Sequence, residues 1–139
     1  ANAVSVPGRD TRWTLNTNGA LTPQTPITMT WSNGRGQVFK RTLRIDNHYL
    51  IEVEQSVTNN GGAPITLYPY ALVAGIGLPE GFSKTGIAHE GPIGYIGDSL
   101  YEIKYKNLDK KGEESESAAK GWIGITEKYW IAALIPPQG

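Results

Sequence analysis

One pair of neighbouring side chains, His89 and Glu90, places a base next to a carboxylate. Successive side chains of a strand point to opposite faces, so two adjacent residues would not act together on one substrate atom. We therefore favour a turn or a partner-facing pair before Gly91-Pro92 over general acid–base catalysis. The other histidine, His48, falls in a predicted hairpin turn, where we expect its side chain to be exposed. The spacing of the two histidines matches no metal-binding motif.

No other group of residues has the spacing of a known catalytic site. The serines include no Gly-x-Ser-x-Gly elbow, so the sequence does not support a serine hydrolase. The glycines at 75, 77 and 81 lack the Gly-x-Gly-x-x-Gly spacing of a phosphate-binding loop. Glu113, Glu114 and Glu116 lie in a charged segment, where solvated carboxylates are a better interpretation than metal ligands. We therefore predict no catalytic residue, no cofactor, no metal site and no enzymatic activity.

Aromatic side chains are the remaining candidates for binding, and they leave two interpretations open. They could line a groove for a peptide or a sugar, or they could fill a core between two sheets. Because aromatic rings dominate the energetics of β cores, the core interpretation is favoured. The sequence assigns no partner-binding residue. The aromatic set is Trp122, Tyr129, Trp130, Tyr68 and Tyr70.

Length and charge exclude several classes of protein. The 139 residues suit one domain, so we predict a single domain over residues 1–139. Thirteen basic and thirteen acidic residues give a net charge of zero, which argues against a nucleic-acid partner. No apolar run approaches the roughly 20 residues of a membrane helix, so we expect this stretch of chain to be soluble. There is no cysteine, which excludes disulfides and thiolate chemistry.

The clearest structural pattern is an antiparallel hairpin from Val38 to Asn59. Apolar and polar residues alternate from Tyr49 to Val57, which is typical of a strand with one buried face and one wet face. Asp46-Asn47 provides the turn between the two strands. We expect the apolar side chains to pack against a second layer of strands, so that Val53→Asp would unfold the domain.

Short apolar runs separated by glycine and proline predict further strands, and hence an all-β, antiparallel fold. The run at 65–73 should extend the hairpin into a meander, and 75–86 should be a glycine-rich loop. The run at 129–135 is apolar on both faces, as in a central strand covered on both sides, and we expect further chain beyond it. The other predicted strands are 11–15, 27–31, 87–97 (broken by glycines), 101–105 and 121–125.

Two segments are predicted to be mobile, residues 1–10 and 106–120. The second is charged, contains small residues and lacks aromatic side chains, so it cannot bury much surface. The best helical candidate in the chain is Glu113 to Lys120, without an apolar stripe. Because loop length has a small effect on stability, deleting Asp109 to Ala118 is expected to leave the fold nearly intact.

Several segments together point to a known family. They are residues 30–34 (TWSNG), 59–67 (NNGGAPITL), 67–72 (LYPYAL), 89–94 (HEGPIG) and 121–136 (GWIGITEKYWIAALIP). In this order and at this spacing they resemble the large periplasmic domain of YidC membrane-protein insertases, especially those of alphaproteobacteria. The resemblance covers nearly the whole chain from Trp13 onward.

The resemblance implies a β-supersandwich, with two packed antiparallel sheets of the galactose-mutarotase-like type. It also implies a non-enzymatic scaffold on the periplasmic side of the bacterial inner membrane, within a multi-pass protein. The expected partners are nascent membrane proteins and auxiliary Sec translocon subunits of the SecD–SecF type. The chain is expected to be a partial copy of the family domain, whose exposed strand edges can pair with another copy.

Two other functional hypotheses stay open at this point. Mutarotase-like sandwiches bind sugars in a cleft, so a carbohydrate-binding or sugar-active protein is the alternative to an insertase domain. It would require a histidine and a carboxylate that converge on a concave face. A chaperone-like groove with exposed aromatic side chains is a variant of the insertase hypothesis, and a large apolar patch would favour it.

Overall fold

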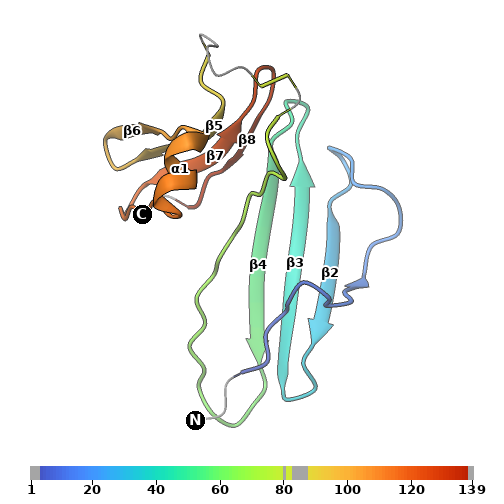
Figure 1. The fold of residues 1–139 in the computed structure, drawn as a ribbon. Helices are drawn as coiled ribbons and strands as arrows, with labels where there is room; N and C mark the ends of the chain where they lie inside the picture. Colours follow the sequence, from blue (N-terminus) through green and yellow to red (C-terminus); the bar gives the residue numbers. More distant parts are fainter. Residues whose placement is uncertain (1–3, 80, 83–87, 138–139) are drawn as a thin grey trace. The chain divides into compact units, whose positions relative to one another are not determined.

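The computed structural model describes residues 4–79, 81–82 and 88–137. The chain divides into two compact units, Ala1–Tyr68 and Pro69–Gly139. Each unit contains one antiparallel sheet of four strands (Figure 1). The prediction of an all-β, antiparallel fold with two sheets is confirmed, whereas the galactose-mutarotase-like type and the single-domain organisation stay predictions. No helix in the described part of the chain is long and apolar enough to cross a membrane.

The sheet of the first unit is a meander in the order β1-β2-β3-β4. Its strands are β1 (Thr14–Leu15), β2 (Ile27–Ser32), β3 (Gln37–Ile45) and β4 (Ile51–Asn59). The predicted hairpin is confirmed, with β3 and β4 paired from Gln37↔Asn59 to Ile45↔Ile51. Asp46 stabilises the turn, because its Oδ1 accepts hydrogen bonds from the backbone N–H groups of His48 and Leu50, at 2.7 and 3.0 Å.

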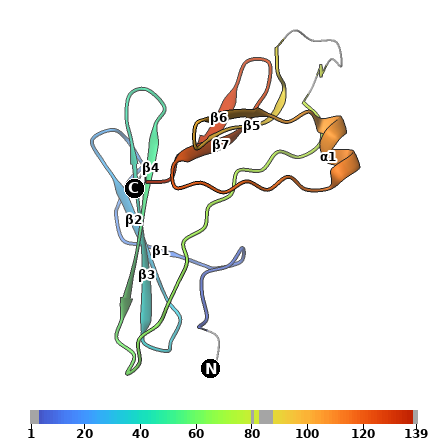
Figure 2. The ribbon, with the colours of Figure 1, turned by 90° about the vertical axis from the view of Figure 1, so that its left-hand side faces the viewer.

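The pairing gives this sheet one mainly apolar face and one polar face, and Figure 2 views the sheet nearly edge-on. Directly opposed residues of antiparallel strands share a face. Two apolar rows cross one face, Trp31–Phe39–Val57 and Ile27–Leu43–Val53. Trp31 and Phe39 have ring centroids 5.5 Å apart. Phe39 is 7% exposed and is the buried hydrophobic residue of the described chain.

The apolar side chains of β4 are exposed, so the first unit by itself does not bury them, and the predicted second layer over them stays a prediction. Ile51, Val53 and Val57 are 55, 51 and 41% exposed, and Tyr49 is 93% exposed. Alternation shows that the two faces of a strand differ, but it does not show that anything covers the apolar face. β4 also lies at an edge of its sheet, where a side chain has a strand neighbour on one side only.

The second unit has the strand order β6-β5-β7-β8, with one short helix. Its elements are β5 (Gly91–Ile96), β6 (Ser99–Glu102), α1 (Tyr105–Lys111), β7 (Gly121–Thr126) and β8 (Ile131–Leu134). The predicted strand at 129–135 is shorter than expected and lies at an edge rather than at the centre. Ile131 and Ile135 are 56 and 63% exposed, so the prediction of burial on both faces is wrong.

The segment 65–73 forms no strand, which corrects the predicted extension of the meander. Pro69 has no N–H group to donate to a ladder, so it interrupts strand pairing in the middle of this run. Residues 75–79 and 81–82 of the predicted glycine-rich loop are irregular as expected. Residues 83–87, which include the start of a predicted broken strand, and residues 1–3 lie outside the described part.

The helix lies earlier in the chain than predicted. α1 spans Tyr105–Lys111, whereas Glu113 to Lys120 contains no helix. Gly112 ends α1 with a φ of 76°, and its N–H group bonds to the carbonyl of Leu108 at 2.6 Å. Lys110 and Lys111 lie in the last turn, where positive charge is favourable at the negative end of the helix dipole. β6 ends at Glu102, and α1 takes up residue 105, the predicted end of this strand.

Candidate interaction surfaces

His89 is bound to the backbone at the start of β5. Its Nε2 lies 3.0 Å from the carbonyl oxygen of Pro92, which also accepts a hydrogen bond from the N–H of Ile103 at 2.9 Å. A carbonyl oxygen can only accept, so Nε2 carries the hydrogen. His89 therefore fixes the backbone at the start of β5, through the carbonyl of Pro92. The carbohydrate-binding alternative, which required this ring on a concave face, is not favoured.

Tyr105 is the titratable group with a clear shift among the described residues. Burial raises its pKa above the ordinary value of 10.0, and the nearby carboxylates of Glu127 and Glu90 raise it further. Its ring also meets the edge of Phe82, with ring centroids 5.5 Å apart. The phenol is therefore neutral at physiological pH. Glu90 thus contributes to the surroundings of the first residue of α1 rather than to a pair with His89.

The remaining polar candidates do not form a reactive centre. His48 is exposed as expected, with Nδ1 3.7 Å from Oδ2 of Asp46. Glu114 forms an ion pair with Lys111, whose Nζ lies 3.1 Å from both carboxylate oxygens. No group of three or more histidine, cysteine or acidic residues in the described ranges could hold a metal ion.

Four of the five candidate aromatic residues are exposed, so neither unit by itself buries them, and a core between the two sheets stays a prediction for them. Tyr129 and Trp130 precede β8 and are 78 and 77% exposed, while Tyr68 and Tyr70 flank Pro69 and are 85 and 77% exposed. Residues in a turn or beside a strand-breaking proline do not alternate across a sheet, so strand periodicity says nothing about their burial. Only Trp122, on β7 opposite Tyr95, is half-buried.

An apolar hollow lies over strands β5 and β7 of the second unit, and we call it the β5–β7 hollow. Its volume is about 400 Å³. Glu114 and Glu116 also line it, and the carboxylate of Glu114 is paired with Lys111, so the apolar side chains are what the hollow offers a ligand. Its apolar lining includes Pro92, Ile96, Tyr101, Ile103, Ile123 and Ile125.

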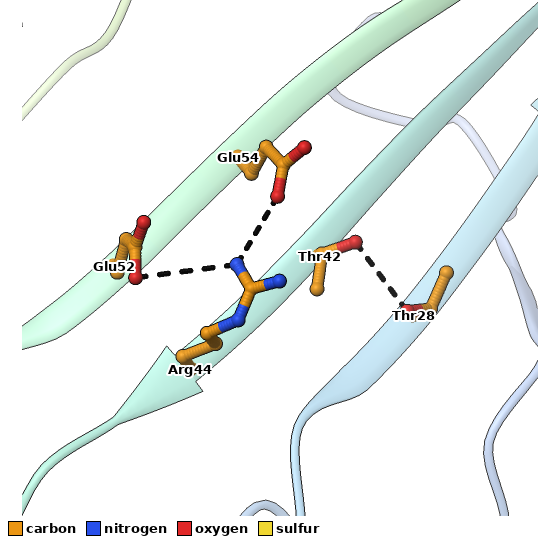
Figure 3. A network of polar contacts seen from close by, with 5 residues as sticks. All are labelled: Thr28, Thr42, Arg44, Glu52 and Glu54. Carbon is orange, nitrogen blue, oxygen red and sulfur yellow. Dashed lines mark hydrogen bonds and ion pairs between the residues drawn. The ribbon is translucent and has the colours of Figure 1, made fainter.

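The polar face of the first sheet carries ion pairs and a contact between two threonines, of which Thr42 is buried (Figure 3). Nη1 of Arg44 lies 3.1 Å from Oε2 of Glu54 and 4.0 Å from Oε2 of Glu52. The Oγ1 atoms of Thr28 and Thr42 are 3.4 Å apart. The three charged side chains are 45 to 65% exposed, and such exposed pairs contribute only about 0–1 kcal/mol to stability.

A polar row crosses the apolar face of the same sheet, and the sequence analysis missed it. Arg41 donates from Nη2 to Oε1 of Gln55 at 3.2 Å, and its guanidinium lies 4.8 Å from the centre of the Trp13 ring. The Nε atom of Arg41 is buried without a hydrogen-bond partner. The sequence alternation could have revealed this row. Arg41 and Gln55 are separated by an even number of positions from the residues of the two apolar rows in their strands, so they lie on the same face.

The comparisons with known proteins agree on one family. The family model of the YidC periplasmic domain matches residues 1–139. Proteins named membrane protein insertase YidC are similar to the chain at 48% identity in Nitrobacter hamburgensis and 44% in Bradyrhizobium diazoefficiens. These matches cover 97 and 96% of this chain but only 22 and 21% of the relatives. A third, from Brucella suis, is 43% identical over 96% of the chain and 22% of its own length.

These relatives come from alphaproteobacteria, which confirms the resemblance drawn from the sequence segments. The chain thus spans about a fifth of the length of the curated relatives that it matches. No solved structure matches it. Because the family model covers the whole chain, the chain belongs to the YidC periplasmic domain family.

Proposed function

We propose that this chain is a non-enzymatic interaction domain on the periplasmic side of the bacterial inner membrane. It belongs to a longer, multi-pass protein that assists the insertion and folding of membrane proteins, alone or with the Sec translocon. The match of the YidC periplasmic domain to residues 1–139 carries this proposal. The name of the relatives, membrane protein insertase, supplies the activity of the whole protein.

The side chains of the described residues support a role in binding rather than in chemistry. His89 is bound to a backbone carbonyl, and the Tyr105 phenol is neutral at physiological pH because its pKa is raised. In contrast, the lining of the β5–β7 hollow is mainly apolar. We propose that this hollow contacts apolar segments of nascent membrane proteins or auxiliary subunits of the SecD–SecF type.

Photo-cross-linking in cells tests this role in the full-length protein. A photoreactive amino acid replaces Ile123, which lines the hollow and is 46% exposed. The control position is Lys40, an exposed residue on the polar face of the first sheet. Mass spectrometry should identify nascent membrane proteins or SecD–SecF-type subunits in adducts from position 123 only. Equal adducts from both positions, or none from either, would contradict the proposal.

A further inference from the structure

The outer edge of β4 is a long row of backbone groups without a strand beside it. β4 has nine residues, all exposed, and β3 is its strand neighbour in the described part of the chain. An unpaired strand edge is a template for another strand, and charged side chains or short length usually block such an edge. Here the two acidic residues, Glu52 and Glu54, lie toward one end of the strand only.

Hydrogen bonds at the two ends of the hairpin show which backbone groups point outward. The N–H of Asp46 bonds to the carbonyl of Leu50 at 3.0 Å, and the N–H of Asn60 bonds to that of Gly36 at 2.7 Å. Bonded and non-bonded pairs alternate along an antiparallel ladder. The even-numbered residues of β4 therefore bond to β3. The odd-numbered residues, from Ile51 to Asn59, direct their N–H and C=O groups toward the free edge.

A second β4 strand, running antiparallel, fits this edge in one register. When Gln55 lies opposite Gln55 of the other copy, the odd-numbered residues of the two strands lie opposite one another. Their outward N–H and C=O groups can then form hydrogen bonds between the copies. Val53 then lies opposite Val57, which continues the apolar face across the junction. Glu54 lies opposite Ser56 on the polar face, and Glu52 lies opposite Thr58, so no two carboxylates face each other.

Shifted registers that keep the two faces matched are less favourable. In the register centred on Glu54, the Glu54 carboxylates of the two copies lie opposite each other. In the register centred on Val53, Glu52 of one copy lies opposite Glu54 of the other. Like charges directly opposite each other destabilise a strand pair. Moving the centre to Ser56 opposes valines to amide side chains and shortens the ladder. The sequence of β4 is therefore self-complementary about Gln55.

We infer that β4 is a self-association edge, at which two copies of this chain pair antiparallel about a two-fold axis through Gln55. The side chain at this axis is already oriented, because Oε1 of Gln55 accepts a hydrogen bond from Arg41 at 3.2 Å. Its amide nitrogen can then donate to Gln55 of the other copy. This inference does not depend on the role proposed above in membrane-protein insertion.

Single cysteines test the register directly, because the chain contains no cysteine of its own. In a hydrogen-bonded antiparallel pair the opposed Cα atoms are about 5.5 Å apart, within the reach of a disulfide. Under mild oxidation Gln55→Cys should therefore form a cross-linked dimer. Val53→Cys alone should not, because its two copies would lie four residues apart along the strand, about 13 Å. A mixture of Val53→Cys with Val57→Cys should cross-link again.

Sedimentation equilibrium tests the association without cross-linking. The unmodified chain should show a monomer–dimer equilibrium, and Gln55→Pro should weaken it at least about tenfold, because proline removes an outward N–H and leaves the β3 bonds in place. Circular dichroism verifies that this variant is folded; the cysteine series decides the matter if it is not. A chain that stays monomeric up to about 1 mM would overturn the inference. Equal cross-linking from Gln55→Cys and from Val53→Cys alone would overturn it as well.

Discussion

Glycine is required at position 121 by both backbone angle and space. Gly121 has a φ of 146°, and a Cβ atom there would collide with the carbonyl oxygen of Tyr95 on the neighbouring strand. We expect Gly121→Ala to destabilise the fold by about 1–3 kcal/mol. Urea denaturation followed by tryptophan fluorescence measures the loss. Gly75→Ala is the matched control in the same unit, because its Cβ would make an ordinary contact of 3.6 Å with Ile125. A similar loss in both variants would contradict this explanation.

The raised pKa of Tyr105 predicts a loss of stability in alkali. Below about pH 10 the tyrosine carries its proton in both the folded and the unfolded chain, so its contribution is fully present. Between that pH and the higher pKa of the folded state, only the folded chain keeps the proton, so stability falls as pH rises. Tyr105→Phe, which keeps the contact with Phe82, should reduce this fall. Urea midpoints of both proteins from about pH 8 to about pH 11 provide the measurement, and parallel curves would refute the assignment.

At the level of single residues, local geometry could be predicted, but burial could not. Adjacent residues on an extended chain diverge, and this rule was enough to reject His89 and Glu90 as a catalytic pair. The exposure of Trp130 and Tyr129 depends on where β8 begins and on β8 being an edge, which are properties of the sheet. Arg41 is a similar case, because its partner Gln55 is fourteen residues away in the sequence.

Among the elements, the hairpin of β3 and β4 was predictable because its signals are local. Alternation, turn residues and β-branched side chains all lie within the segment that forms it. Whether another layer covers β4 depends on distant parts of the chain, which local signals do not describe. The helix was predicted too late in the chain, and the reason is that its local signals were misinterpreted. Its C-terminal stop, Gly112, and its terminal lysines are local signals, but the charge of the segment was interpreted as a sign of a loop.

Substitutions on neighbouring strands should separate the buried position of the first sheet from an exposed one. Phe39→Ala should destabilise the fold by about 3 kcal/mol, because this side chain is 7% exposed. Val53→Ala, at a position that is 51% exposed, should destabilise it by only about 1 kcal/mol. Val53→Asp should likewise leave the chain folded, with a smaller loss than Phe39→Ala. Urea denaturation followed by tryptophan fluorescence measures all three. Unfolding of Val53→Asp would restore the original expectation of a covered strand.

The segment after α1 can be tested without disturbing the helix. Deleting Asp109 to Ala118 would remove the last turn of α1, so the sharper change is to replace 113–118 with glycine and serine at equal length. All six residues are exposed, and we expect the free energy of unfolding to change by less than about 1 kcal/mol. Thermal melting by circular dichroism gives the comparison, with Leu108→Ala in α1 as a variant expected to lose more. A large loss after replacing 113–118 would show that the contacts of this segment around the β5–β7 hollow stabilise the fold.

For the whole molecule, a net charge of zero makes association depend on local charge rather than on overall repulsion. Gln55→Glu would place two carboxylates face to face at the inferred axis. Dimerisation should weaken at least about tenfold at low salt and partly recover at high salt, where the repulsion is screened. Sedimentation equilibrium at two salt concentrations measures this effect. Lys40→Glu, which changes a charge on β3 away from the edge, is the control and should show a much smaller effect.

Family membership was more accessible from sequence than the details of the fold. Segments such as 89–94 and 121–136 retain residue types at fixed spacing, so they indicate the family even where strand limits are misplaced. The irregular path of 65–73 was less accessible, since its apolar pattern suits a strand and only Pro69 argues against one. The periodicity of a segment shows which secondary structure suits its side chains, whereas strand pairing also requires a neighbouring strand with free backbone groups.

The two rims of the first sheet differ greatly in length. β4 is nine residues long, while β1, at the opposite rim, consists only of Thr14 and Leu15. A strand of two residues offers almost no template on which a further molecule could grow. If β4 joins two copies, both remaining rims of the enlarged sheet are β1 strands. Growth through this sheet would then stop after a single step and yield discrete pairs.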